Sequence, residues 1–223
     1  MRPFWILVTV MLAASLFASW AMLPVLPERM AVHWGLSGQP DGWMDRLPAV
    51  LFMPALMLAL AIFLEWLPRI DPRHNIPKFI IAYEQFLLAL LFLLAMVHLD
   101  MLAWGAGLHI PPTLVLTVGF GLLLFSISRL LAASLPNYFI GIRTPWALED
   151  DSNWHATHRL AASLYHWSVP VCLLGLLIPA WSIWLLLLAA IVPSLLAVAY
   201  SYLAYAQKKK KPAKRRRSKK RAR

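Results

Sequence analysis

The side chains best suited to chemistry lie together in one polar stretch, residues 137–159, which reads NYFIGIRTPWALEDDSNWHATHR. Within it, His155 and His158 follow an acidic run at residues 149–151. Metalloprotease helices space two histidines at i, i+4 with a glutamate between them. Here the spacing is i, i+3 with Ala-Thr between, and the stretch has no nucleophile elbow of the hydrolase type. The pattern therefore argues against a membrane enzyme, and we expect neither a metal nor another cofactor.

The same stretch contains several residues that would give it a fixed shape. Asn137 follows a proline and can end a helix with an Asx turn. Gly141 permits a positive φ or a close backbone approach, and Pro145 fixes its own φ while extending the residue before it. Arg143 lies between these two stiff points. Residues 150–153 combine N-capping side chains with negative charge, which predicts a helix start; in that helix Trp154 and His158 would be i, i+4 neighbours.

A second polar stretch covers residues 24–47. Residues 30–34 alternate large with small or polar side chains, which predicts a short extended segment. Residues 35–42 are rich in Gly, Pro and Asp and predict turns, with Trp34 and Trp43 on either side. Two interpretations remain open: a compact loop anchored by its tryptophans, or a rigid aromatic surface that recognises a ligand.

The elements that must position these stretches are apolar. The chain has 223 residues, of which 61% are hydrophobic and 14% charged, whereas soluble domains have about 25% charged residues. About 20 apolar residues cross a bilayer as a helix, and helices satisfy their own backbone groups there. The last apolar block is long enough for two helices, with a turn near Pro179–Ser182. We thus expect an all-α polytopic membrane bundle of six transmembrane helices, in the runs 4–23, 48–67, 78–99, 111–135 and, as a pair, 162–205.

Positive charge predicts the orientation of the chain, because cytoplasmic loops are rich in Lys and Arg. Twelve of the 21 Lys and Arg lie in residues 208–223. If this end is cytoplasmic, six spans place the N-terminus there too. The external loops then hold only Arg29 and Arg46, and the remaining basic residues fall on the cytoplasmic side. We expect both termini, and the stretch 137–159, inside the cell. The run 4–23 is longer than a signal-peptide core, so we expect it to remain as the first helix.

Ionisable residues within spans are few, and such residues are functional candidates in membrane proteins. Glu84 lies about two turns into the third span and Arg129 near the end of the fourth. We expect Glu84 to form a structural ion pair with Arg129 or Arg143. The single cysteine, Cys172, is expected to be a small hydrophobe. No row of acidic residues of the kind used by proton-driven transporters is present.

The chain divides into four expected segments. Residues 1–67 hold two helices and the external loop, residues 68–135 two more helices, and residues 136–206 the polar stretch with the last two helices. Residues 207–223 form a basic block, which we expect to be disordered and solvated. It could attach to anionic lipids at the membrane surface, contact the ribosome or nucleic acid, or simply determine topology, which is the interpretation we favour.

Both polar stretches resemble a known family. Asn137-x-x-x-Gly141-Ile142-Arg143-Thr144-Pro145-Trp146-x-Leu148, followed by Trp154-x-x-Thr157-His158-Arg159, resembles the signature of the SdpI family of multi-pass bacterial membrane proteins. Leu26-Pro27, His33-Trp34 and Gly38-x-Pro40-Asp41-Gly42-Trp43 resemble the companion domain of unknown function found in many members. One departure is Ala161-Ala162, where members commonly have a glycine.

The resemblance implies a protein of the bacterial cytoplasmic membrane with two activities. One is immunity against a secreted toxin peptide, met at the external loop. The other is signalling, by holding a small ArsR-like transcriptional repressor at the cytoplasmic stretch, without direct contact to nucleic acid. A small transporter or exporter of a peptide or lipophilic substrate is the alternative. The expected ligand- and partner-binding residues are His33, Trp34, Asp41, Trp43, Asn137, Gly141, Arg143, Pro145, Trp146, Trp154, His158 and Arg159.

Overall fold

The computed structural model describes residues 3–36 and 38–221, with side chains as far as residue 209. Its long helices are α1 (Pro3–Met22), α2 (Arg46–Ile70), α3 (Ile80–Gly105), α4 (Pro112–Ala133), α6 (Asp151–Leu173) and α7 (Ser182–Arg221). The shorter elements are β1 (Arg29–Trp34), β2 (Pro40–Asp45), α5 (Pro145–Glu149) and the 3-10 turns η1 (Ile76–Phe79), η2 (Leu174–Leu176) and η3 (Pro179–Trp181). The expected all-α architecture is confirmed, with one small hairpin added to it.

Five helices in the described part of the chain are long and apolar enough to cross a membrane: α1, α2, α3 with its leading turn, α4 and α7. α6 is as long as the others but begins with the polar sequence DSNWHATHR, which lowers its mean hydropathy. The expected six spans therefore become five clear ones and a sixth helix of mixed character. The turn between the last two helices falls at Pro179–Trp181, as the sequence predicted.

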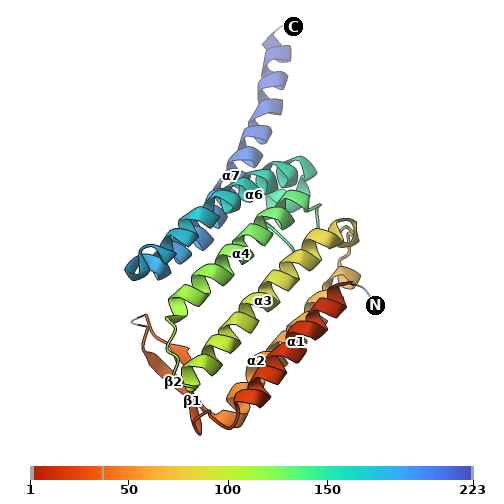
Figure 1. The fold of residues 1–223 in the computed structure, drawn as a ribbon. Helices are drawn as coiled ribbons and strands as arrows, with labels where there is room; N and C mark the ends of the chain where they lie inside the picture. Colours follow the sequence, from red (N-terminus) through yellow and green to blue (C-terminus); the bar gives the residue numbers. More distant parts are fainter. Residues whose placement is uncertain (1–2, 37, 222–223) are drawn as a thin grey trace.

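The helices pack side by side in a bundle in which α3 and α4 are central (Figure 1). α1 and α2 pack on one side of this pair, and α6 with α7 on the other. The start of α1 and the basic end of α7 lie at one end of the bundle (Figure 1). The β1–β2 hairpin lies at the opposite end. The two polar stretches therefore lie at opposite ends of the bundle, because the three helices α2, α3 and α4 run between them in the chain.

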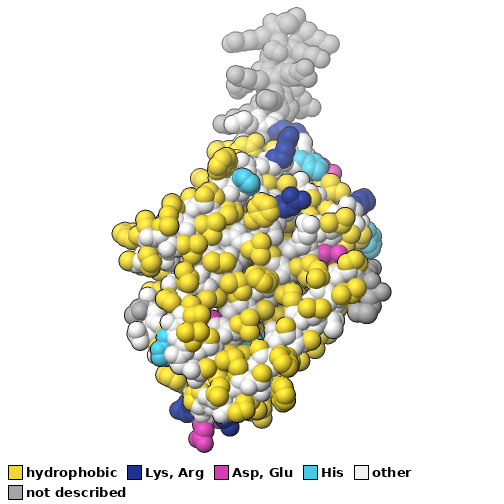
Figure 2. All heavy atoms as spheres, in the orientation of Figure 1, with side chains coloured by type: hydrophobic (Ala, Val, Ile, Leu, Met, Phe, Trp, Pro, Cys, Tyr) yellow, Lys and Arg dark blue, Asp and Glu magenta, His cyan; other side chains and the backbone are white. Residues whose placement is uncertain are grey.

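The outer surface of the bundle is largely apolar. Figure 2 shows hydrophobic side chains over most of the visible face, with charged side chains towards the two ends. Large residues such as Phe17, Ile62 and Leu195 are more than half exposed on α1, α2 and α7. Contiguous apolar surface of this extent is a surface for lipid or protein rather than for water, so the chain is a multi-pass membrane protein.

The hairpin pairs β1 and β2 in antiparallel register, with Arg29 opposite Asp45 and an irregularity next to His33. The extended segment expected at residues 30–34 is confirmed. β2 was not expected, because Pro40-Asp41-Gly42 is typical of a turn. The strand pairing is irregular at this point, and an irregular pairing tolerates a proline and a glycine within a strand.

α7 continues as a helix to Arg221, where we expected disorder from residue 207. Lys, Arg and Ala are good helix formers, and extending a helix that is already packed avoids the cost of nucleation. Those two effects favour a helical backbone in spite of repulsion between like charges.

Candidate functional site

Asn137 shapes the polar stretch 137–159 from within. Its side chain is fully buried. Oδ1 accepts the backbone N–H groups of Phe139 and Ile140 at 2.9 and 2.7 Å, while Nδ2 donates to the carbonyl oxygens of Leu135 and Ile140. The expected Asx turn is therefore present, and it closes the chain on itself directly after α4. A side chain in this position has no surface left for a partner protein.

Gly141 and His158 form the second fixed point. Gly141 has φ +105°, and a Cβ atom at this position would overlap the His158 imidazole at Nε2. His158 is 2% exposed; its Nε2 lies 3.0 Å from the N–H of Ile142, and its Nδ1 lies 2.8 Å from the carbonyl oxygen of Trp154. These contacts define a neutral ring that donates through Nδ1 and accepts at Nε2. Both nitrogens are occupied, whereas His155 is exposed.

Trp154 anchors the stretch to α4. It is fully buried, stacks on His158 at 4.0 Å between ring centroids, and donates Nε1–H to the carbonyl oxygen of Ser134 at 3.1 Å. We expected Asn137, Trp154 and His158 to contact a partner. Their burial corrects this expectation, because they hold the stretch in shape instead.

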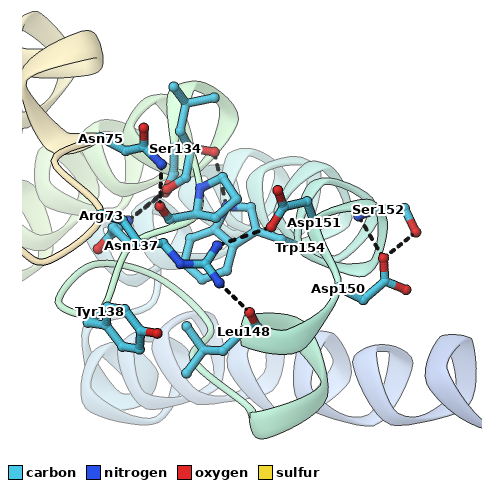
Figure 3. A network of polar contacts seen from close by, with 12 residues as sticks. Arg73, Asn75, Ser134, Asn137, Tyr138, Leu148, Asp150, Asp151, Ser152 and Trp154 are labelled. Atoms are coloured by element: carbon cyan, nitrogen blue, oxygen red, sulfur yellow. Dashed lines mark hydrogen bonds and ion pairs between the residues drawn. The ribbon is translucent and has the colours of Figure 1, made fainter.

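The connector between α2 and α3 clamps the stretch from the other half of the chain (Figure 3). Arg73 donates to Asp151 Oδ1 at 3.0 Å and to the carbonyl oxygen of Leu148 at 2.6 Å, and its guanidinium lies over the Tyr138 ring. Asn75 donates to the carbonyl oxygen of Pro136 at 2.7 Å. The clamp thus holds both the beginning of the stretch and the start of α6.

Asp71 completes this clamp, and sequence reasoning missed it. Its carboxylate is fully buried and accepts the backbone N–H groups of Tyr138 and Asn75 at 3.1 and 3.3 Å. The sequence marks this region only as a proline-rich connector. The pairing joins residues 67 positions apart, and no local pattern announces such a contact.

α7 holds the stretch from the far side. Ser201 bonds Thr144 through their hydroxyl groups at 2.8 Å, and its carbonyl oxygen accepts from Asn153 Nδ2 at 2.9 Å. Lys208 pairs with Asp150 Oδ2 at 2.6 Å. This ammonium group, together with the Ser152 hydroxyl, lowers the pKa of Asp150 to about 2. Asp150 also accepts the Ser152 N–H and so caps α6, as expected.

The exposed part of the stretch carries the remaining predicted residues. Arg143 is exposed and donates to the carbonyl oxygen of Tyr138 at 2.9 Å, so its position is fixed as expected. Arg159 is exposed on α6, and Pro145 is the first residue of α5. Trp146 packs against two tyrosines of α7 and lines a cavity of about 350 Å³ together with Glu149, Asp150, Tyr205, Lys208 and Lys209. These residues form the accessible polar surface at this end.

The hairpin gathers the four predicted residues of the external loop. His33 Nδ1 and Asp41 Oδ1 form a short contact between the two strands. Gly35 makes room for that carboxylate, since a Cβ there would lie 2.9 Å from Asp41 Oδ2. Trp43 is 53% exposed. Trp34 turns towards the bundle and meets Trp104 of α3 edge to face. The hairpin is therefore a fixed element with one aromatic side chain outside and one inside.

The expected ion pair of Glu84 with Arg129 or Arg143 stays a prediction. Glu84 lines a cavity with Glu65 and Arg69 near the start of α3, whereas Arg129 lines a separate, mainly apolar cavity of about 420 Å³ between α1, α3 and α4. The two cavities lie against different faces of α3, which the sequence alone does not reveal.

Comparison with known proteins finds one family-model match at each end of the bundle. A model described as a domain of unknown function, DUF1648, matches residues 10–58, which include the hairpin. The model of the SdpI/YfhL protein family matches residues 135–202, from the Asx turn to α7. The immunity protein SdpI of Bacillus subtilis (strain 168) is 25% identical over 198 residues, which cover 87% of this chain and 90% of that protein. The resemblance to the SdpI family is confirmed over residues 135–202.

The two models match the two stretches that the sequence analysis singled out. The SdpI-family model covers the buried anchors, the exposed arginines and Ser201 together, so the family region is one packed unit. The clamp residues 71–75 lie outside both matched ranges. No solved structure matches the chain.

Proposed function

We propose that this chain is an immunity protein that protects the bacterial cytoplasmic membrane against a secreted antimicrobial peptide. The similarity to an immunity protein over most of both chains supports this function. The structural observation that carries it is the pairing of two preorganised polar elements at opposite ends of one apolar bundle. A ligand arriving from outside first meets the hairpin.

The hairpin suits contact with a peptide. Trp43 and Leu36 expose apolar surface on it, and the His33–Asp41 contact fixes the strands that carry them. A rigid aromatic side chain binds at low entropic cost, which is why tryptophan is enriched among residues that dominate binding energy. We therefore expect the peptide to contact Trp43 first.

The test uses a bacterial strain that is sensitive to a secreted antimicrobial peptide, grown with and without this chain and challenged with the purified peptide. We expect the chain to raise the inhibitory concentration and Trp43→Ala to remove most of that increase. Trp167→Ala is the matched control, because Trp167 is a tryptophan of similar exposure on α6 and not on the hairpin. A wild-type chain without effect on a panel of such peptides refutes the function, whereas full protection by Trp43→Ala refutes only the contact.

The cytoplasmic stretch supports a second activity, sequestration of a small ArsR-like repressor. Arg143 and Arg159 are exposed cations on a surface held rigid from three sides, and Trp146 lines a cavity beside them. A fixed cationic surface favours an acidic partner. In cells that express a fluorescently tagged ArsR-like regulator from the same genome, we expect membrane localisation with the wild-type chain and a dispersed signal with Arg143→Ala plus Arg159→Ala. A dispersed signal with the wild-type chain refutes this activity.

Transport is not favoured by these contacts. The two intramembrane residues that could begin a polar path, Glu84 and Arg129, line separate cavities. Anionic lipids remain a proposed partner of the basic end of α7, where each Lys or Arg near the surface contributes about 1 kcal/mol.

A further inference from the structure

Three buried polar atoms near the hairpin end of the bundle have no hydrogen-bond partner within the described part of the chain: Nδ1 of His98, Oδ1 of Asp100 and Nε1 of Trp34. His98 faces α1, where its Nε2 lies 2.9 Å from the Ser19 hydroxyl, whereas Asp100 and Trp34 both face the hairpin side. Asp100 as a residue is 6% exposed. A buried carboxylate is unfavourable unless a cation or donors accompany it, and a buried indole N–H usually finds an acceptor. The two groups are therefore complementary to something other than their present neighbours.

Both side chains line the same cavity of about 250 Å³. Its walls come from four elements that the fold brings together: the hairpin, α3, the start of α4 and the start of α7. The described residues that line it are Val32, His33, Trp34, Gly35, Leu36, Gly38, Val97, Asp100, Pro112, Thr113, Val115, Leu116 and Ile183. Apart from a few polar groups these walls are apolar, so a charge that enters is held by Asp100 and not by water.

A second cavity of about 370 Å³ adjoins the first. The two share Leu36, Gly38, Pro112, Thr113 and Ile183 as lining residues. The second cavity adds Gln39 and His109, whose side chains can hydrogen-bond to a peptide backbone. Together they form a recess that leads from a polar surface beside the hairpin to the Asp100 carboxylate.

The unpartnered groups define the chemistry of the ligand. Asp100 requires a cation that can donate hydrogen bonds, and the Trp34 N–H requires an acceptor close to it. The face of a tryptophan also attracts a cation. A primary ammonium group next to a carbonyl oxygen has all of these features. The volume is below the roughly 300–1,000 Å³ of pockets that enclose drug-sized ligands, so it suits one residue rather than a whole peptide.

We propose that this cavity binds an ammonium group of a peptide, with Asp100 as its counter-ion and the Trp34 indole as donor to a neighbouring carbonyl oxygen. The ammonium group is either the α-amino terminus or a lysine side chain. The inference deepens the proposed function, since the peptide antagonised by this chain is the natural source of that group. The polar second cavity, built by the hairpin, favours a peptide over the ammonium headgroup of a lipid.

The test measures binding directly on the full chain in nanodiscs of phosphatidylglycerol, which has no amine. Saturation-transfer NMR titrates three probes: leucyl-leucine amide with a free α-amino group, N-acetyl-leucyl-lysine amide with a free ε-amino group, and N-acetyl-leucyl-leucine amide with neither. We expect one or both of the first two to bind and the third to bind at least tenfold more weakly. Equal binding of all three overturns the proposal, as does the absence of binding by any of them.

Variants locate the site. Asp100→Asn keeps the shape and removes the charge, so we expect Kd for the amine probe to rise about tenfold or more. Asp45→Asn is the matched control, because Asp45 is an exposed carboxylate on the same hairpin end, and it should leave Kd unchanged. Trp34→Phe keeps an aromatic ring and removes the N–H donor. We therefore expect it to raise Kd for both amine probes, but by less than Asp100→Asn does.

Thermal melting in the same nanodiscs separates a binding role from a structural one. An unpartnered buried carboxylate is a cost to the empty protein, so Asp100→Asn should melt no lower than the wild type. Unchanged binding by Asp100→Asn overturns the proposal, and so does displacement of the probes by phosphatidylethanolamine in the disc, which would identify a lipid site. None of these measurements uses protection of cells, so their failure is distinct from failure of the immunity function.

Discussion

Replacing Asn137 with alanine removes the centre of the polar stretch 137–159. The substitution leaves the N–H groups of Phe139 and Ile140 without their acceptor in a buried site. Each buried group left unsatisfied costs about 1–3 kcal/mol, so the pair should lower the local opening free energy by roughly 2–6 kcal/mol. The lower bound alone corresponds to about thirtyfold faster amide exchange, since 1.4 kcal/mol is a factor of ten.

Hydrogen exchange measured by mass spectrometry, on the chain in nanodiscs, follows peptides that cover residues 135–145. Asn137→Asp is the matched control: it keeps an acceptor oxygen for both N–H groups but replaces the Nδ2 donor by a charged oxygen, so its exchange should lie between the wild type and Asn137→Ala. Peptides from α3 report whether the effect stays local. Exchange of residues 135–145 in Asn137→Ala within twofold of the wild type would refute the reasoning.

Three further predictions follow from the same contacts. Gly141→Ala should destabilise the chain more than Gly107→Ala, because both glycines have positive φ but only Gly141 has a ring against its Cβ position; equal melting temperatures would contradict this. Lys208→Met should raise the pKa of Asp150 from about 2 towards 3.8, because the Lys208 ammonium group is the main cause of the lowering. In the wild type, the stability that this ion pair contributes is complete above about pH 4 and is lost as the pH falls towards 2. Carboxylate NMR titration measures that shift, with Lys209→Met as the control that should leave it unchanged. Removal of residues 210–223 should leave protection intact, and a loss of protection in a normally inserted protein would show that the basic block has a role beyond topology.

The sequence predicted the parts of this fold that depend on local pattern. Runs of about 20 apolar residues located the spans, and Pro179 located the turn between α6 and α7, because both signals come from the chain itself. Gly141 showed the two properties expected of it, a positive φ and close packing. Asn137 and residues 150–153 behaved as their capping chemistry predicted.

Contacts between distant segments were beyond such reasoning. The clamp from Asp71 and Arg73 depends on how the two halves of the bundle meet, and the burial of His158 depends on where Ile142 passes over it. Asp100 was visible as an ionisable residue at the end of a span. Its missing partner and the tryptophan beside it became apparent only once the hairpin had been placed over α3.

The clamp has a practical consequence for anyone who modifies this protein. Short connectors between membrane helices are usual places for inserting an epitope tag or a protease site, because loops tolerate insertion when their backbone is free. The connector that carries Asp71, Arg73 and Asn75 is bonded into the stretch after α4, so an insertion there would separate the two halves of the bundle at the end opposite the hairpin. Tags belong instead beyond Lys209, where the chain has left the bundle.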